Sequence, residues 1–270
     1  MPAVALPTAA ACRSCGTENP PETNFCRGCG IRLQGESPSP RPAVAAPAPA
    51  PPAPSGAASC RLIAVRRDGS DGDAHPLRGD QIDIGGADGA LVFDDPHLAR
   101  RHARVSKEGS VYTLIPLEAR NGVYVRLRAP LDLDDGQYIL LGKQVLRFEL
   151  MSDVEKIVRP ALEHGVVLFG TPVKAPWARL RQMTAAGTAR DIHHLCRTEV
   201  VLGREQGDIV FSDDEFLSRR HAQVSFRGGR ARLEDLGSSN GTFARLAGPH
   251  PLTSGEMIRL GDELLRFELG

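Results

Sequence analysis

The distribution of apolar and polar positions after residue 60 is typical of β-structure. Short runs that are apolar, or alternate with polar residues, recur, among them RLIAV at 61–65, VYTLI at 111–115 and VLRFEL at 145–150. Pairs of turn-forming residues, such as Asp-Gly, Gly-Gly and Asn-Gly, separate these runs. Many short strands at close spacing favour a sandwich or barrel over alternating strands and helices. We therefore expect an all-β fold.

The same pattern occurs twice along the chain. Arg61-Leu62 matches Arg179-Leu180, and matching residues stay the same number of positions apart along both copies. One extra residue in the second copy, near Glu215, increases this separation by one. The sequence Arg-Phe-Glu-Leu then closes both copies. Because one insertion aligns the whole length, and each copy has the size of one domain, we predict two β-sandwiches in tandem. The first copy covers residues 60–150 and the second copy covers residues 178–270.

Two further segments connect the predicted domains. Residues 36–59 are dominated by Pro and Ala, a composition that cannot bury a core, so we predict a disordered linker there. Residues 151–177 connect the two copies. Ser152 and Glu155 have the spacing of a helix capping box, so a helix is expected only in part of this connector, limited by Pro160.

Composition narrows the classes of function. The 33 Lys and Arg side chains equal the 33 Asp and Glu side chains, which argues against bulk electrostatic binding to nucleic acid but allows a local cationic pocket. No run of 18 apolar residues is present, and the apolar N-terminal residues have no Lys or Arg before them. We therefore expect a cytoplasmic protein without a membrane-spanning helix.

Several side chains in the second copy are suited to binding a phosphate ester. Arg204 carries a planar, permanently charged guanidinium that can donate two hydrogen bonds to phosphate oxygens. Ser218 can donate a hydroxyl bond, and Arg219 adds a second cation. Asn240 offers both a donor and an acceptor, which suits holding a peptide backbone beside the phosphate. A phosphorylated side chain, with about −1.5 to −2 charges and three acceptor oxygens, is a complementary ligand.

The order of these motifs resembles that of the forkhead-associated (FHA) family. The elements of that family, Gly-Arg, Ser-x-x-His and Asn-Gly, occur here in order as Gly203-Arg204, Ser218 to His221 and Asn240-Gly241. The resemblance covers both copies and implies β-sandwiches that bind phosphothreonine peptides through the loops at one end. It also implies that Ser239 lines the pocket, and that the structural residues Gly203, His221 and Gly241 do not touch the ligand.

Each element alone has a plainer explanation. Asn-Gly is a common hairpin turn, adjacent arginines are usually solvated, and Ser218 can cap a loop. His221 is best explained as a hydrogen-bonded framework residue. The three elements in this order, within a β-rich domain of this length, favour phosphate binding by the second copy.

The first copy keeps the framework of the motif but lacks its two strongest phosphate ligands. Gly86 stands in place of Arg204, and Ala99 in place of Ser218. A lost charge-assisted hydrogen bond costs about 1.5–3 kcal/mol, so we predict a degenerate FHA-like sandwich that does not bind phosphothreonine in the usual way. The alternative is a different anion bound by the cations of this copy. The residues concerned are the framework positions Gly85, His102, Asn121 and Gly122, and the cations Arg100, Arg101 and Arg120.

Four cysteines near the N-terminus form two close pairs, Cys12-x-x-Cys15 and Cys26-x-x-Cys29. Two such pairs, each followed by Gly and joined by a short hairpin, supply the four thiolates that a tetrahedral Zn²⁺ needs. The pattern resembles a zinc ribbon, so we predict that residues 1–35 fold around one structural Zn²⁺. Disulfides or free thiols are the alternative, and a reducing cytosol disfavours disulfides.

These observations together favour a non-enzymatic adaptor in Ser/Thr kinase signalling. The sequence has no P-loop and no arrangement of nucleophile, base and acid, so we predict no catalytic residue. The second copy would capture a phosphothreonine-containing protein, a Ser/Thr kinase or its substrate, and the composition and ribbon-plus-FHA arrangement resemble bacterial proteins. Two alternatives are a phosphate-independent scaffold of a larger assembly, such as a secretion apparatus, and a zinc-ribbon protein that binds nucleic acid.

Overall fold

The computed structural model describes residues 10–12, 17–20, 60–157, 159–172 and 174–270. Every regular element in these residues is a β-strand, which confirms the all-β expectation. The chain divides into two compact units, residues 1–55 and 56–270. A search of the described residues for a helix of sufficient length and apolar character to cross a membrane finds none.

The N-terminal unit contains one short hairpin. Strand β1 (Ala10–Ala11) pairs antiparallel with β2 (Glu18–Asn19). Cys12, directly after β1, is buried, and its N–H donates to the carbonyl of Thr17 at 2.9 Å. The other three predicted zinc ligands, Cys15, Cys26 and Cys29, lie outside the described residues, as does the predicted linker 36–59.

The two copies contribute ten strands each to the second unit. The first copy forms β3 (Cys60–Val65), β4 (Asp71–Pro76), β5 (Gln81–Gly85), β6 (Leu91–Val92), β7 (Ala103–Glu108), β8 (Val111–Pro116), β9 (Val123–Arg126), β10 (Leu131–Asp132), β11 (Tyr138–Leu141) and β12 (Gln144–Leu150). The second copy forms β15 (Ala178–Met183), β16 (Ala189–Leu195), β17 (Glu199–Gly203), β18 (Ile209–Val210), β19 (Ala222–Arg227), β20 (Arg230–Asp235), β21 (Thr242–Arg245), β22 (His250–Leu252), β23 (Glu256–Leu260) and β24 (Glu263–Leu269).

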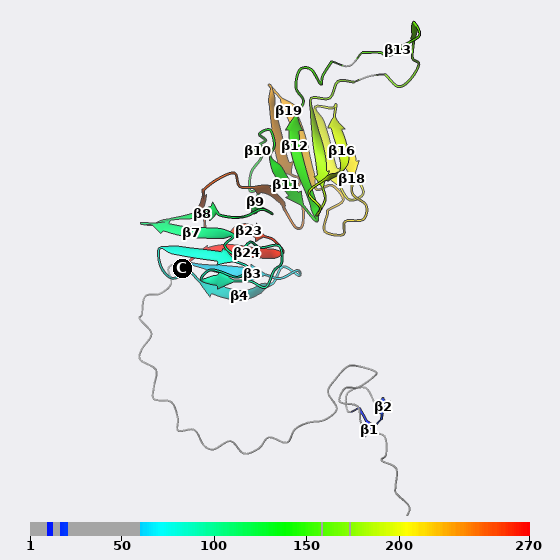
Figure 1. The fold of residues 1–270 in the computed structure, drawn as a ribbon. Coiled ribbons are helices and arrows are strands. Elements are labelled where there is room, and N and C mark those ends of the chain that lie inside the picture. Colours follow the sequence, from blue (N-terminus) through cyan, green and yellow to red (C-terminus); the bar gives the residue numbers. More distant parts are fainter. Residues whose placement is uncertain (1–9, 13–16, 21–59, 158, 173) are drawn as a thin grey trace, which may run out of the picture. The chain divides into compact units, whose positions relative to one another are not determined.

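The strand order within the sheets mixes the two copies. One ten-stranded sheet has the order β16-β15-β12-β11-β21-β9-β23-β24-β3-β4, and the two five-stranded sheets have the orders β22-β8-β7-β5-β6 and β10-β20-β19-β17-β18. The last strand of the first copy, β12, pairs with β15 of the second copy, and β24 of the second copy pairs with β3 of the first. Each copy therefore gives its closing strands to the other (Figure 1).

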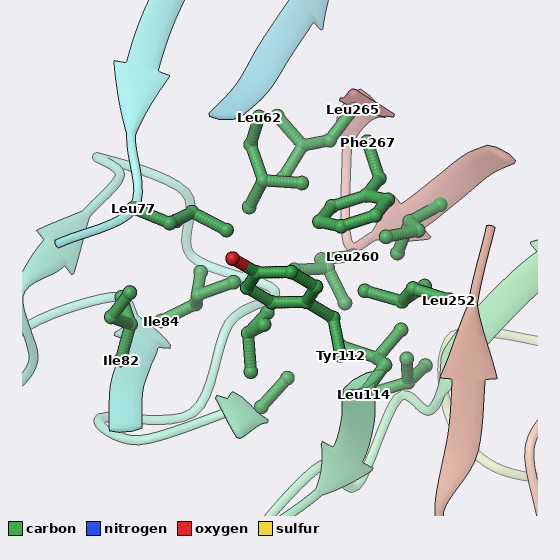
Figure 2. Packing of buried hydrophobic residues seen from close by; sticks show 14 of the residues in the cluster. Leu62, Leu77, Ile82, Ile84, Tyr112, Leu114, Leu252, Leu260, Leu265 and Phe267 are labelled. Carbon is green, nitrogen blue, oxygen red and sulfur yellow. The ribbon is translucent and has the colours of Figure 1, made fainter. Parts of the chain in front are cut away.

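We call β3–β9 with β22–β24 the first sandwich, and β10–β12 with β15–β21 the second sandwich. Figure 2 shows the core of the first sandwich, in which side chains of both copies interdigitate. The rings of Tyr112, from the first copy, and Phe267, from the second, lie 5.4 Å apart between centroids. The core residues labelled there are Leu62, Leu77, Ile82, Ile84 and Leu114 from the first copy and Leu252, Leu260 and Leu265 from the second.

The core of the second sandwich is built in the reciprocal way. Phe148 at the end of the first copy is fully buried in a cluster with Leu180 and Leu202 of the second copy. The two sandwiches are also continuous through β21 and β9, which pair antiparallel with Phe243 opposite Arg126. A single hydrogen-bonded sheet thus crosses both sandwiches.

The expectation that each copy would form its own sandwich is therefore wrong. The physical reason lies in the closing strands, which read QVLRFEL at 144–150 and ELLRFEL at 263–269. Both bury the same Leu and Phe positions, Leu146 and Phe148 in one and Leu265 and Phe267 in the other. Because side-chain pattern and volume are almost the same, either strand fits the core of either sandwich.

Residues 151–157, 159–172 and 174–177, the described part of the connector between the copies, contain no helix, contrary to expectation. Ser152 and Glu155 do form the hydrogen bonds of a capping box, at 3.0 Å from the Ser152 N–H to Oε2 and 3.4 Å from the Glu155 N–H to Oγ. A single turn follows, and Pro160 has no N–H with which to extend it. The chain instead forms a two-stranded hairpin of β13 (Leu162–Glu163) and β14 (Val166–Val167).

The strand exchange predicts that matched core mutations act on opposite copies. Phe267→Ala should remove about 3–5 kcal/mol from the first sandwich and expose β5 and β7 to hydrogen exchange. Phe148→Ala should expose β17 and β19 instead. Hydrogen exchange with mass spectrometry on both variants checks this expectation. Loss of protection in β17 and β19 on Phe267→Ala would mean that each copy closes its own sandwich.

Candidate functional site

The structure brings the predicted phosphate ligands together at one end of the second sandwich. Arg204 follows β17, Ser218 lies in the segment before β19, and Ser239 lies between β20 and β21. The N–H of Arg204 donates to the carbonyl of Ser218 at 3.0 Å, and the N–H of Ser239 donates to Ser218 Oγ at 3.1 Å. Ser218 thus connects all three loops and keeps its own hydroxyl proton for a ligand.

Asn240 and Arg219 complete the cluster of predicted ligands. The Asn240 side-chain amide donates to the carbonyl of Phe216 at 2.8 Å, which fixes the Ser239-Asn240 loop against the Ser218 loop. The carbonyl of Arg219 accepts the N–H of Gln206 at 3.0 Å, so that the guanidinium-bearing loops are held side by side. All five predicted ligand residues therefore lie on three adjoining loops.

Gly203 is required by this close approach of the loops. A Cβ atom at Gly203 would overlap the carbonyl oxygen of Arg219. Any larger residue would therefore push the Ser218-Arg219 loop away from Arg204. The same relation holds in the first copy between Gly85 and Arg100.

His221 is a buried link between two of the loops. Its Nδ1 accepts the N–H of Ser218 at 3.1 Å, and its Nε2 lies 3.1 Å from the carbonyl of Gly241. Because Nδ1 accepts a hydrogen bond, the proton of the neutral ring is on Nε2 and is donated to Gly241. Burial lowers the pKa of His221, although the Gly241 carbonyl opposes this shift, so the neutral form is favoured.

Asp235 organises the Ser239-Asn240 loop and was not found from the motif. Its Oδ2 accepts the hydroxyls of Ser238 and Thr242, both at 2.6 Å, and Oδ1 accepts the N–H of Ser238 at 2.8 Å. Burial alone would raise the pKa of Asp235, but these hydrogen bonds outweigh burial and lower it. The Ser238 Oγ in turn accepts the N–H of Gly241 at 2.9 Å.

The network around Asp235 can be recognised in the sequence by comparing the two copies. The positions of Asp235, Ser238 and Thr242 are occupied in the first copy by Pro116, Ala119 and Val123. All three polar groups are replaced together by apolar ones, which leaves no buried partner unsatisfied. Joint replacement of this kind indicates that the three side chains act as one unit.

An internal carboxylate bridges the two predicted phosphate-binding arginines. Glu205 Oε1 lies 2.7 Å from Arg204 Nη2, and Oε2 lies 3.2 Å from Arg219 Nε. The cluster is thus already arranged around an anion, with both guanidinium groups directed toward one carboxylate. The first copy has Ala87 at the position of Glu205.

The corresponding end of the first sandwich is an open cleft of about 740 Å³. Ala99, Arg120 and Asn121 line this cleft, together with Pro96, His97, Leu98, Leu117, Glu118 and Ala119. The framework bonds persist, since His102 Nδ1 accepts the N–H of Ala99 at 3.0 Å and Asn121 donates to the carbonyl of His97 at 2.8 Å.

Two cations considered for an alternative anion site in the first copy are already paired. Arg100 Nε lies 2.8 Å from Asp88 Oδ2, and Arg101 Nη2 lies 2.5 Å from Asp83 Oδ2. Arg101 shares this carboxylate with Arg104, whose Nε lies 2.6 Å from Oδ1. These pairs leave Arg120 as the candidate cation that lines the cleft.

The strand exchange places first-copy residues beside the binding loops of the second copy. In the turn between β11 and β12, the Lys143 N–H and the Gln144 side-chain amide each donate to Asp214 Oδ2 at 2.7 Å. Asp214 is buried, and its Oδ1 accepts the N–H of Phe216 at 3.0 Å. The Ser218 loop is therefore held in place by the other copy.

Comparison with known proteins finds one family model that matches a segment of each copy. The FHA domain family model matches residues 79–142 and 200–261, one segment in each copy. The transcriptional regulatory protein EmbR of Mycobacterium tuberculosis is 29% identical over 100 residues, which are 36% of this chain and 26% of EmbR. The FHA domain-containing protein FhaB of the same organism is 34% identical over 70 residues, which are 25% of this chain and 45% of FhaB. The chain thus spans about a quarter to under half of these relatives.

Solved FHA structures are also similar to this chain. A crystal structure of the FhaA FHA domain complexed with the intracellular domain of Rv3910 is 33% identical, covers 32% of this chain and 96% of that chain, and has a TM-score of 0.23. A structure of Mycobacterium tuberculosis EmbR in complex with a low affinity phosphopeptide is 26% identical, covers 33% of this chain and 27% of that chain, and has a TM-score of 0.19. The two family matches support a tandem FHA-domain protein.

Proposed function

We propose that this tandem FHA-domain chain is a non-enzymatic adaptor that binds a phosphothreonine peptide through the loops of its second copy. The observation that carries the proposal is the cluster around Ser218, into which Arg204, Ser239 and Asn240 are drawn by hydrogen bonds. The phosphate would accept hydrogen bonds from the guanidinium groups of Arg204 and Arg219 and from the Ser218 hydroxyl. Binding would displace the Glu205 carboxylate, since a doubly charged phosphate competes for the same donors.

We propose that the first copy does not bind phosphothreonine. Gly86 and Ala99 remove the guanidinium and the hydroxyl, and Pro116, Ala119 and Val123 remove the polar network that shapes the loop. Its Arg100 is occupied by Asp88. The contribution of this copy is structural, because its turn at Lys143 and Gln144 holds the binding loop of the other copy.

We also propose that the adaptor acts in signalling by a Ser/Thr kinase. Phosphothreonine in a partner requires a Ser/Thr kinase to have acted on that partner, so the ligand would be the kinase itself or one of its substrates. A net formal charge of zero gives no support to the alternative of nucleic-acid binding.

Arg204→Ala should weaken binding of phosphothreonine peptides by about tenfold or more, because a charge-assisted hydrogen bond contributes about 1.5–3 kcal/mol. The matched control is Arg100→Ala in the first copy, which should leave binding unchanged. Fluorescence-polarisation titration of the full chain with a phosphothreonine peptide library measures both. If Arg100→Ala removed binding and Arg204→Ala did not, the roles of the two copies would be the reverse of those proposed.

Glu205→Gln should tighten binding of the same peptides. The substitution removes the negative charge that the phosphate must displace while it keeps the size of the side chain. Because the pair is partly exposed, the expected gain is modest, roughly two- to fivefold. The same titration checks this; weaker binding by the Glu205→Gln variant would show that the carboxylate supports the binding conformation and does not compete with phosphate.

We propose one structural Zn²⁺ in the N-terminal unit, held by Cys12, Cys15, Cys26 and Cys29. The hairpin of β1 and β2 and the buried position of Cys12 are compatible with a metal-centred turn. Zinc would supply the folding free energy that so short a segment cannot obtain from apolar burial. It would have no catalytic role, since four thiolates leave no open coordination position.

The full chain should therefore retain about one equivalent of zinc after dialysis, and Cys12→Ser should lose it. The matched control is Cys196→Ser, which changes an exposed cysteine of the second copy and should leave the zinc content unchanged. Elemental analysis by mass spectrometry gives the measurement. Zinc-free wild-type chain prepared under reducing conditions would contradict the proposal.

A further inference from the structure

A second cleft adjoins the proposed phosphothreonine site. It has a volume of about 410 Å³, and Ser239, Asn240 and Phe216 of the second copy form one side of it. Ser239 and Asn240 belong both to the phosphate-binding loops and to this cleft. A peptide held by Asn240 beside its phosphate would therefore continue into the cleft within a few residues, at about 3.3 Å per extended residue.

The lining of this cleft is strongly cationic. Six of its residues are cations and two carry carboxylates, Glu215 and Asp262. The cations are Arg66, Arg67, Arg126, Lys143, Arg259 and Arg266. Four of them belong to the first copy, so the second copy alone does not have this surface.

Several of these cations are available to a ligand. Arg266 is engaged by Asp71 and Glu268, whereas no ion pair within residues 60–157 and 174–270 includes Arg67 or Arg126. Arg126 lies directly against the Asn240-Gly241 turn, since a Cβ atom on Gly241 would overlap its guanidinium. The guanidinium of Arg126, which has no ion pair in these ranges, thus lies beside Asn240, where a bound peptide would enter the cleft.

Lys143 lies beside Phe216, the residue that binds the Asn240 side chain. Its Nζ lies 4.7 Å from the centroid of the Phe216 ring, and the carbonyl of Phe216 accepts the hydrogen bond from Asn240 at 2.8 Å. The residue at the position of Lys143 in the second copy is Asp262, and the strand exchange sends Asp262 to the first sandwich, where it lies 3.9 Å from His97. The exchange thus places Lys143 beside the Phe216 loop, where its Nζ also lies 3.3 Å from Oε1 of the exposed Glu215.

We propose that this cleft selects phosphothreonine peptides with Asp or Glu residues on one side of the phosphothreonine. The inference rests on the proposed function and adds the class of sequence that the site prefers. Carboxylates of the peptide would pair with Arg67 and Arg126 and would compete with the exposed Glu215 for Lys143, while the phosphate is held at Arg204 and Ser218. Recognition of the flanking sequence is then a property of both copies, although only one holds the phosphate.

The test compares three phosphothreonine peptides on the full chain. All have seven residues with a central phosphothreonine; one has Ala at every flanking position, one has Glu at the three positions before it, and one has Glu at the three positions after it. We expect one of the two Glu peptides to bind about tenfold more tightly than the Ala peptide, and this difference to shrink as salt rises.

The double variant Arg67→Gln/Lys143→Gln should lose most of the preference while it keeps the affinity for the Ala peptide. The control Lys174→Gln/Arg190→Gln removes the same charge from exposed positions outside the cleft and should keep the preference. Equal binding of the three peptides by the wild-type chain, or a preference that survives the cleft variant, would overturn the inference and leave the proposed function intact. Failure of all three peptides to bind would instead count against the phosphothreonine site.

Discussion

The antiparallel pairing of β24 with β3, and of β12 with β15, is the constraint on which the rest of the second unit depends. Each pair joins the last strand of one copy to the first strand of the other, and buries Phe267 or Phe148 in a core to which the other copy contributes most of the residues. Neither sandwich can close without both copies. Each sandwich therefore needs strands of both copies, and loss of a closing strand opens the core of the sandwich that contains this strand.

This exchange also decides which side chains surround the ligand-binding loops. The turn between the two closing strands reaches the end of the sandwich where the loops lie, so each copy supplies one turn to the other's site. At the second copy, that turn holds Asp214 through Lys143 and Gln144. At the first copy, the N–H of Asp262 donates to Asp95 at 2.7 Å in the equivalent manner. Binding loops and their supports thus come from different copies.

The sequence alone was sufficient to predict the strands and the residues that meet at the loop end. Gly203, Arg204, Ser218, His221 and Asn240 stand in a fixed order, and close approach of the backbone, as at Gly203, leaves few alternatives for their arrangement. The network around Asp235 was also accessible, because the two copies differ there at three positions together. Its members lie within residues 235–242 but are not part of the Gly-Arg, Ser-x-x-His or Asn-Gly elements, and so were not recognised.

The partner of each closing strand could not be predicted, for a physical reason. Side-chain pattern specifies which face of a strand is buried, but QVLRFEL and ELLRFEL present the same face. Their choice between two nearly identical cores depends on the path of residues 127–130 and 246–249, short segments without a strong pattern. The expected helix did not form, although Ser152 and Glu155 make the hydrogen bonds of the cap. The residues after the cap lack helical periodicity, and Pro160 follows them.

The same constraint explains why the first copy, which has Gly86 and Ala99 in place of Arg204 and Ser218, retains an intact framework. His102 makes the same two hydrogen bonds as His221, to the N–H of Ala99 and the carbonyl of Gly122, although no guanidinium or hydroxyl is positioned by them. These bonds keep the loop end of the first sandwich ordered, and β22–β24 of the second copy depend on that sandwich for their partners. The first copy can lack side chains equivalent to Arg204 and Ser218 but cannot lack its fold, because its strands complete the second sandwich.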